Sequence, residues 1–138
     1  MNIQILNRRN ALLLALTAAI TPSIASAQAP QIVFTSWGGS TQAAQKTHWA
    51  EPFAASSGIK VVMDGPTDYG KFKAMVESGN VAWDVVDVEG DFAARAAKDG
   101  LLEPIDYNVV NKNGLDSRFS STHYVGSFYY SFVLGYNK

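Results

Sequence analysis

Short apolar segments alternate with segments of helical pattern along most of this chain, and this alternation narrows the possible folds more than any other feature. Segments rich in β-branched or aromatic residues predict strands at 31–35, 59–63, 81–88 and 124–136. Apolar residues at helical spacing predict helices at 40–49, 51–55, 69–77 and 91–98. Such alternation is typical of an α/β fold with a mostly parallel sheet flanked by helices. The continuous apolar run at 81–88 predicts burial on both strand faces.

The expected helix ends follow from capping residues. Ser40 or Thr41 is expected to cap the first helix, and Asp91 to cap the last one. Pro52 is expected to kink the first helix, and Gly100 to end the last. Apolar residues predicted to face inward are Phe72, Met75, Val76, Phe92, Ala93 and Ala96.

The N-terminal 27 residues are predicted to be a cleavable signal peptide. Arg8 and Arg9 form a positive start without acids, and 11–20 is an uncharged Leu/Ala run too short to span a membrane. The small residues at 25–27 supply a cleavage site. The lack of a polar face disfavours the alternative, an amphipathic helix of the folded domain. The arginine pair also fits a twin-arginine signal, but its neighbours depart from that motif and favour the general secretory route.

Composition excludes several classes of function. Beyond the signal peptide the chain has nine Lys and Arg against twelve Asp and Glu, because the peptide holds two of the 11 basic residues and no acid. This mild acidity argues against nucleic acid as a partner. The chain has no cysteine, so it has no disulfide, thiol nucleophile or zinc–thiolate site. No cofactor or metal site is predicted, and the isolated histidines, His48 and His123, are expected to be surface or loop residues.

The loop after the first predicted strand is a candidate ligand site. In open α/β sheets, ligands bind beyond the carboxyl ends of strands. Trp37 offers a stacking surface, and Gly38 and Gly39 let the backbone approach a ligand beside the N–H groups of the next helix. Ser40 adds a hydroxyl. The alternative is a tight turn with Trp37 in the core.

A second candidate site follows the third predicted strand. Period-two alternation puts Asp87 and Glu89 on one face with Trp83 and Val85, so the two carboxylates are expected to point together and bind a cationic group. A solvated or capping role is the alternative. The acids at 87, 89 and 91 resemble the start of a calcium loop, but Lys98 stands where that loop needs Glu.

The aromatic segment 127–131 is a third candidate. Alternation places Tyr129 with two serines on one face, and Phe128 and Tyr130 on the other. Tyr129 is therefore a predicted ligand contact, although core packing explains the phenylalanines equally well.

Several motifs, taken in order, resemble one known family. They are the export tag, Ser-Trp-Gly-Gly at 36–39, Glu-Pro-Phe at 51–53, Ser-Gly-Ile-Lys-Val at 57–61, Trp-Asp-Val-Val-Asp at 83–87, Gly-Leu-Leu-Glu-Pro-Ile at 100–105 and Gly-Tyr-Asn-Lys at 135–138. Together they resemble the N-terminal part of an extracellular solute-binding protein of an ABC importer, in the spermidine/putrescine-binding branch.

The resemblance implies a type II periplasmic binding protein with two lobes and a ligand between them. Residues 28–138 would be an incomplete N-terminal lobe, and 124–136 the strand that crosses into the second lobe. The protein would be periplasmic, capture a small polar solute of cationic, polyamine-like character, and deliver it to an inner-membrane permease through transient contact. Of the polyamine-binding residues only Trp37 carries over, because Gly38, Gly39, Val88 and Gly90 stand where those proteins have hydroxyl or tyrosine side chains.

Catalysis is not expected, because no recognised nucleophile or metal-binding motif is present. Two other classes of function stay open as alternatives. One is an exported enzyme that uses Asp87 and Glu89 as acid and base. The other is a ligand-sensing domain that feeds a membrane receptor.

Overall fold

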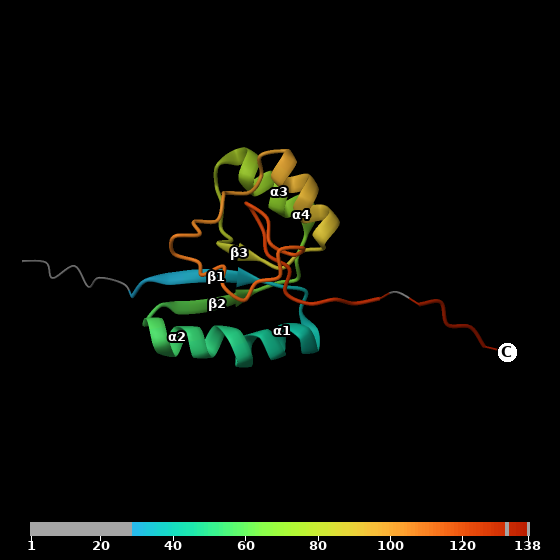
Figure 1. Ribbon diagram of the computed structural model, residues 1–138, viewed down its shortest axis with the longest axis horizontal. Helices are drawn as coiled ribbons and strands as arrows, with labels where there is room; N and C mark the ends of the chain where they lie inside the picture. The colour runs from blue at the N-terminus through green and yellow to red at the C-terminus, as the bar shows by residue number, and fades with distance from the viewer. Residues whose placement is uncertain (1–28, 132, 138) are drawn as a thin grey trace, which may run out of the picture.

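The computed structural model describes residues 29–131 and 133–137, so the predicted signal peptide lies outside the described residues. A three-stranded parallel sheet forms the centre (Figure 1). Its strands are β1 (Gln31–Thr35), β2 (Lys60–Asp64) and β3 (Val85–Val86), in the order β2-β1-β3. β1 pairs with β2 along its whole length and with β3 only through Phe34 and Thr35. The predicted α/β class is confirmed.

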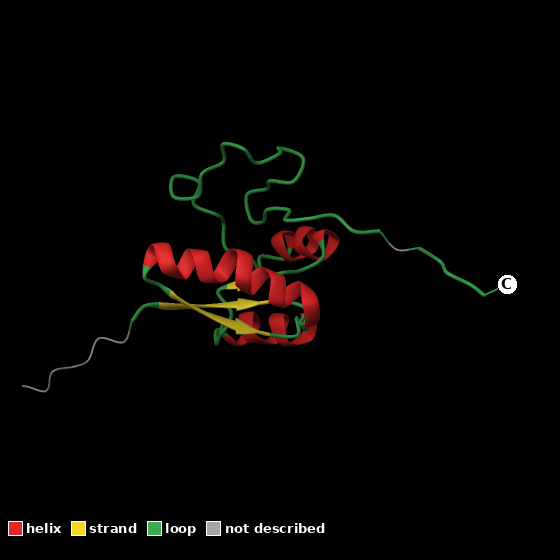
Figure 2. Cartoon of the chain, turned by 90° about the horizontal axis from the view of Figure 1, so that it is seen from below, coloured by secondary structure: helices red, strands yellow, loops and turns green. Residues whose placement is uncertain are grey.

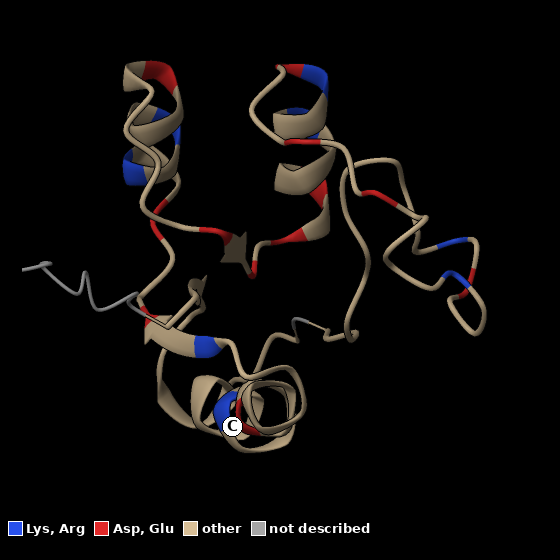
Figure 3. Cartoon of the chain, turned by 90° about the vertical axis from the view of Figure 1, so that its left-hand side faces the viewer, with Lys and Arg blue, Asp and Glu red and all other residues tan. Residues whose placement is uncertain are grey.

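Helices cover both faces of this sheet. They are α1 (Gly39–Gln45), the π-helical turn η1 (Lys46–Ala50), α2 (Glu51–Ser57), α3 (Tyr69–Ser78) and α4 (Gly90–Lys98). α1, η1 and α2 follow one another on one face, and α3 and α4 lie on the other (Figures 1 and 3). Both α3 and α4 carry acidic and basic residues (Figure 3). The predicted strand–helix order therefore produces three layers, as parallel strands require.

The helix ends correct two predicted caps. Gly38, rather than Ser40 or Thr41, is the N-cap residue of α1, and no side chain caps that end. Glu89 is the N-cap residue of α4, whereas the Asp91 carboxylate accepts a hydrogen bond from Arg95 at 2.7 Å. α1 and α4 start without side-chain caps because tertiary contacts hold them, whereas the Asp68 carboxylate caps α3 by accepting from the Lys71 N–H at 2.7 Å.

Pro52 shapes the long helix through its missing N–H. The carbonyl oxygen four residues before a proline loses its usual donor. Here the helix widens into η1, and the Glu51 N–H donates to the Lys46 carbonyl oxygen five residues back. The expected kink is therefore a π-helical turn between α1 and α2.

The main core lies between the sheet and the pair α3 and α4. Phe72, Trp83 and Ala96 are buried at its centre. The partly buried residues packed on them are Val33, Met75, Val76, Val86, Phe92, Leu101 and Leu102. Ala93 is also buried, so the predicted inward faces of both helices are confirmed. Gly100 follows the C-cap residue Asp99 with φ +72°, which agrees with its expected role at the end of α4.

The predicted strand at 81–88 is wrong in length, because β3 has only two residues. The Val33 N–H of β1 donates to the Asp84 carboxylate at 2.7 Å, so a side chain takes the place of a backbone acceptor there. The pairing with β1 consequently begins only at Val85. Apolar composition alone did not reveal this side-chain competition.

The predicted strand at 124–136 is also wrong within the described residues. Residues 101–131 form turns and loops beside the sheet and helices (Figure 2), and their one β contact is an isolated bridge between Ser120 and Val125. Residues 133–137 extend away from the body, and Leu134 is fully exposed (Figure 1). β-propensity does not produce a strand where no neighbouring strand supplies hydrogen bonds.

Candidate functional site

The carboxyl ends of the three strands bring together residues from three loops. Trp37 follows β1, Tyr69 begins the helix after β2, and Glu89 follows β3. Trp37 is 40 % exposed, and its ring makes a T-shaped contact with the Tyr69 ring, with 5.8 Å between centroids and 81° between ring planes. The Glu89 N–H donates to the Tyr69 hydroxyl at 3.1 Å. A continuous set of contacts therefore runs across this edge of the sheet.

Tyr69 is held from below by the last helix. Its ring stacks on Phe92 of α4, with 3.7 Å between centroids and 5° between ring planes. Burial, countered in part by the hydrogen bond from Glu89, raises the pKa of Tyr69 above 10.0. The hydroxyl is therefore neutral at physiological pH and available as a donor.

Tyr130 from the C-terminal loops completes this group. Its hydroxyl donates to Glu89 Oε1 at 2.9 Å. This hydrogen bond is the main cause that raises the pKa of Tyr130 above 10.0. Glu89 thus contacts two tyrosines, Tyr69 through its backbone N–H and Tyr130 through its carboxylate, and Trp37 contacts the Tyr69 ring. We call Trp37, Tyr69, Glu89 and Tyr130 the strand-end cluster.

Asp87 makes a different set of contacts from Glu89. Its Oδ2 accepts a hydrogen bond from Gln45 Nε2 at 2.6 Å and lies 3.5 Å from Ser36 Oγ. The predicted shared face with Trp83 is wrong, because Trp83 and Val86 both belong to the α3/α4 core. The bend around Asp84 breaks the period-two alternation. The Asp87 carboxylate therefore bonds to Gln45, whereas the Glu89 carboxylate bonds to Tyr130.

The glycine loop leaves open space next to Trp37. Gly38 and Gly39 have φ values of +84° and +60°, which side-chain-bearing residues rarely adopt. A Cβ atom added at Gly39 would meet no atom within 4 Å. Ser40 is exposed in the first turn of α1. The turn therefore presents backbone and one hydroxyl at the edge of the cluster.

Tyr129 lies apart from these contacts. Its ring packs edge-on against Phe119, with 4.7 Å between centroids, and it is 73 % exposed. The Phe128 and Tyr130 rings lie near each other, with 6.5 Å between centroids. The tyrosine hydroxyl that reaches an acid of the cluster is therefore that of Tyr130.

The same rule about strand ends could have found one residue that the sequence analysis omitted. Tyr69 lies just after the second strand, as Trp37 and Glu89 lie after the first and third. Tyr130 had no such signal, because its approach to Glu89 depends on the irregular path of residues 101–131.

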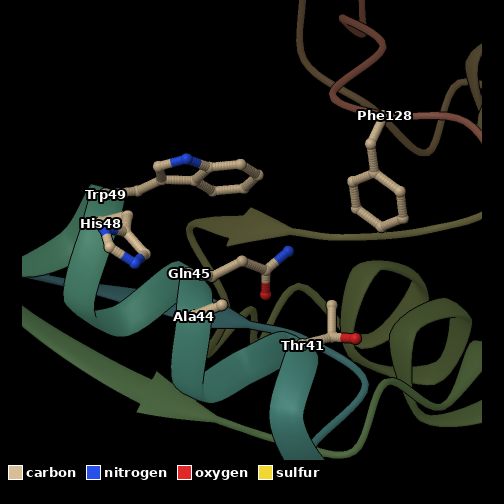
Figure 4. A pocket seen from close by; sticks show the side chains of 6 residues that line it. All are labelled: Thr41, Ala44, Gln45, His48, Trp49 and Phe128. Carbon is tan, nitrogen blue, oxygen red and sulfur yellow. The ribbon is translucent and has the colours of Figure 1, made fainter.

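A cavity of about 320 Å³ lies elsewhere, along α1 and η1. Thr41, Ala44, Gln45, His48, Trp49 and Phe128 line it. Phe128 lies across the cavity from Trp49 (Figure 4). The cavity shares no residue with the strand-end cluster, and no Asp, Glu, Lys or Arg side chain lines it.

The described residues meet the requirements neither of a metal site nor of a membrane-spanning helix. Within 29–131 and 133–137, no group of three or more His, Asp or Glu side chains could hold a metal ion. Among these same residues, none of the helices has the length and apolar character needed to cross a bilayer.

Comparison with known proteins identifies the family. Residues 48–138, more than half of the chain, match the family described as bacterial extracellular solute-binding protein. A gamma-aminobutyric acid-binding protein from Pseudomonas aeruginosa is 41% identical over 83 residues, which are 59% of this chain and 24% of that protein.

Solved structures agree with this relationship. The Atu4243-GABA receptor is 62% identical with a TM-score of 0.71, over 74% of this chain and 32% of that one. AgtB from A. tumefaciens R10, in complex with agropinic acid, is 46% identical with a TM-score of 0.65, over 69% and 30% of the two chains. An ABC transporter substrate-binding protein from Bradyrhizobium japonicum USDA 110 is 34% identical with a TM-score of 0.66, over 70% and 30%.

The chain spans about a quarter to a third of the length of these relatives. They are solute-binding proteins rather than enzymes, as the sequence analysis expected. They do not confirm the polyamine-binding branch that the motifs suggested. By the extent of the family match, this chain belongs to the bacterial extracellular solute-binding proteins.

Proposed function

We propose that this chain forms part of the periplasmic solute-binding component of an ABC importer, and that its strand-end cluster binds the amino group of a small solute. The observation that carries the proposal is the meeting of Trp37, Tyr69, Glu89 and Tyr130 at the carboxyl ends of the sheet. This edge is where open α/β sheets bind ligands.

The chemistry of the cluster suits an ammonium group. A carboxylate attracts a cation and accepts its hydrogen bonds, and the face of an indole ring attracts it further. Glu89 already accepts one hydrogen bond from Tyr130, and the remaining acceptor capacity of its carboxylate is available for a ligand N–H. Trp37, which contacts Tyr69 of the same cluster, is 40 % exposed, so a ligand would cover apolar surface as it binds.

We propose γ-aminobutyrate as the leading solute, with polyamines as the second class. Two relatives carry γ-aminobutyrate in their names, and a third is in complex with agropinic acid. γ-Aminobutyrate and putrescine share an ammonium group on a short alkyl chain, which is the part that Glu89 and Trp37 would recognise. The backbone of Gly38 and Gly39 and the Ser40 hydroxyl would contact the rest of the solute.

The remaining features of the protein are proposals of the same kind. Residues 1–27 would direct export, and 28–138 would belong to the N-terminal lobe of a two-lobed protein. A second lobe would close over the strand-end cluster, and a permease would receive the solute through transient contact. Extracellular placement of the family supports a periplasmic location.

Calorimetric titration of the complete natural protein tests the proposed function. We expect binding of γ-aminobutyrate or putrescine and none of butyrate, which lacks the ammonium group. Trp37→Ala should weaken binding about tenfold or more, because it removes the stacking surface and the cation–π contact. Glu89→Gln should weaken it at least tenfold, because it removes the charge.

The matched control is Trp49→Ala, which removes an exposed tryptophan that lines the separate cavity. This variant should bind the solute as tightly as the wild type. Unchanged affinity in Trp37→Ala and Glu89→Gln would show that the solute binds elsewhere.

A further inference from the structure

A network of hydrogen bonds ties together the three strand ends beneath the cluster. The Thr67 N–H donates to the Ser36 carbonyl oxygen at 3.0 Å, and the Thr67 hydroxyl donates to the Asp87 carbonyl oxygen at 3.0 Å. The Ser36 N–H donates to the Asp64 carbonyl oxygen at 3.1 Å. The loops after β1, β2 and β3 are thus linked to one another and not only to their own strands.

Gln45 of α1 lies at the centre of this network. It is 3 % exposed, and its amide makes two short hydrogen bonds. Its Oε1 accepts from the Ser36 hydroxyl at 2.5 Å, and its Nε2 donates to Asp87 Oδ2 at 2.6 Å. A buried amide with both ends satisfied holds its neighbours in fixed places.

The charge of Asp87 sets the direction of these bonds. An ionised carboxylate only accepts, so the Gln45 amide must turn its nitrogen toward Asp87 and its oxygen toward Ser36. Among the described residues, no Lys or Arg forms an ion pair with Asp87. Its contacts are therefore to neutral donors that belong to the protein.

Three members of the network, one in each strand-end loop, precede a member of the strand-end cluster by one or two residues. Ser36 precedes Trp37, Thr67 precedes Tyr69, and Asp87 precedes Glu89. The network therefore fixes the backbone from which the three proposed ligand-binding side chains project.

We infer that Gln45 and Asp87 are positioning residues that hold Trp37, Tyr69 and Glu89 in their binding arrangement, and that Asp87 does not itself contact the solute. This inference rests on the proposed function. It also replaces the expectation that the Asp87 carboxylate binds a cationic group of the solute.

Exchange of the acid and the amide tests the inference. Gln45→Glu alone places two carboxylates at a contact that is now 2.6 Å long, so it should weaken solute binding at least tenfold. Addition of Asp87→Asn restores one acceptor and one donor, and affinity should return to within about threefold of the wild type. Asp87→Asn alone should lose less than Gln45→Glu, because an asparagine oxygen still accepts from the Gln45 amide.

A solute that contacts Asp87 directly would give a different pattern. Asp87→Asn alone would then lose more affinity than Gln45→Glu, and the paired variant would bind as weakly as Asp87→Asn. Either result would overturn the inference, as would a paired variant that binds no better than Gln45→Glu. If Gln45→Glu does not fold, the paired variant still decides between these outcomes.

Gln42→Glu is the matched control for the exchange. Gln42 lies on the same helix, but its Nε2 donates to the Asp64 carbonyl oxygen rather than to Asp87. Asp87→Asn should therefore not rescue it. Affinities are measured in the complete protein well below each melting temperature, so that a general loss of stability does not enter.

A second readout separates failure of this inference from failure of the proposed function. Within residues 1–138, a Trp49→Phe background leaves Trp37 and the buried Trp83 as the tryptophans, so the difference in emission between two variants made in it reports on them. Gln45→Glu should shift the emission of Trp37, and the paired exchange should restore it. If the wild type binds no amine, the proposed function fails, but the emission of Trp37 still tests the positioning role. An emission that Gln45→Glu leaves unchanged would overturn the positioning role.

Discussion

The two faces of the sheet differ in how completely they are covered. Toward α3 and α4, Val33 packs on a core in which Phe72 and Trp83 are each 6 % exposed. Toward α1, η1 and α2, Phe34 stacks on Trp49 with 6.5 Å between centroids, yet Trp49 is 46 % exposed. Adjacent residues of one strand thus meet a closed core on one side and an open aromatic layer on the other.

The two faces therefore contribute differently: one mainly stabilises the fold, and the other mainly positions side chains. The α3/α4 face buries large apolar side chains, which is the main stabilising contribution in a small domain. The opposite side contributes the polar network of Ser36, Gln45 and Asp87, which fixes directions rather than burying area. The strand-end cluster lies where these two kinds of support meet.

The difference in burial predicts unequal losses of stability when a tryptophan is removed from each face. Trp83→Ala should lower the free energy of unfolding by about 3–5 kcal/mol, because it empties a buried site. Trp49→Ala, on the open face, should cost roughly 1 kcal/mol, because about half of its surface is already in water. Urea unfolding of the complete protein measures both. Equal losses would show that the open aromatic layer is as well packed as the core.

A second prediction concerns the close approach of β2 to the network. A Cβ atom at Gly65 would lie 2.6 Å from the Ser36 carbonyl oxygen and 2.8 Å from Gln42 Oε1. Gly65→Ala should therefore cost about 1–3 kcal/mol of unfolding free energy. Gly90→Ala is the matched control, since a Cβ there meets nothing within 4 Å and should be neutral or slightly stabilising. Equal melting temperatures for the two variants would contradict tight packing at Gly65.

The smallest effect is a pH dependence at the edge of the core. The hydrogen bond from Trp83 Nε1, at 2.6 Å, is the main cause that lowers the pKa of Asp64 below 3.8. Since the unfolded chain then binds this proton more tightly, the stabilisation is present above about pH 4 and disappears as pH falls through the lowered value.

Melting temperatures between pH 6 and pH 3 measure this dependence. Asp64→Asn should flatten the acid side of the profile relative to the wild type. Trp83→Phe keeps a ring in the core but removes the donor, so it should flatten the profile as well. An acid profile unchanged in both variants would exclude this carboxylate as a source of acid sensitivity.

Much of the fold could be predicted because its signals are local. The strand at 31–35, the α3 and α4 helices and their inward faces follow from apolar spacing and glycine ends. The errors occurred where tertiary contacts decide the outcome. Asp84 shortens β3 through a side-chain hydrogen bond, and 124–136 lacks a neighbouring strand within the described residues.

Part of the candidate site could also be predicted, for the same reason. Trp37 and Glu89 follow strands, and the carboxyl ends of parallel strands meet at one edge. The separation of Asp87 from Glu89 was not predictable, because it depends on the buried partner Gln45 on a helix 42 residues earlier. The contact between Tyr130 and Glu89 likewise spans 41 residues of irregular chain.

A crystal structure of the complete protein with γ-aminobutyrate would show directly whether Glu89 and Trp37 bind the ammonium group. We expect the ammonium group within hydrogen-bond distance of the Glu89 carboxylate and against the Trp37 ring, with the Gln45–Asp87 hydrogen bond intact beneath. A solute that lies in the cavity beside Trp49, or whose ammonium group is bound without Glu89 and Trp37, would contradict it.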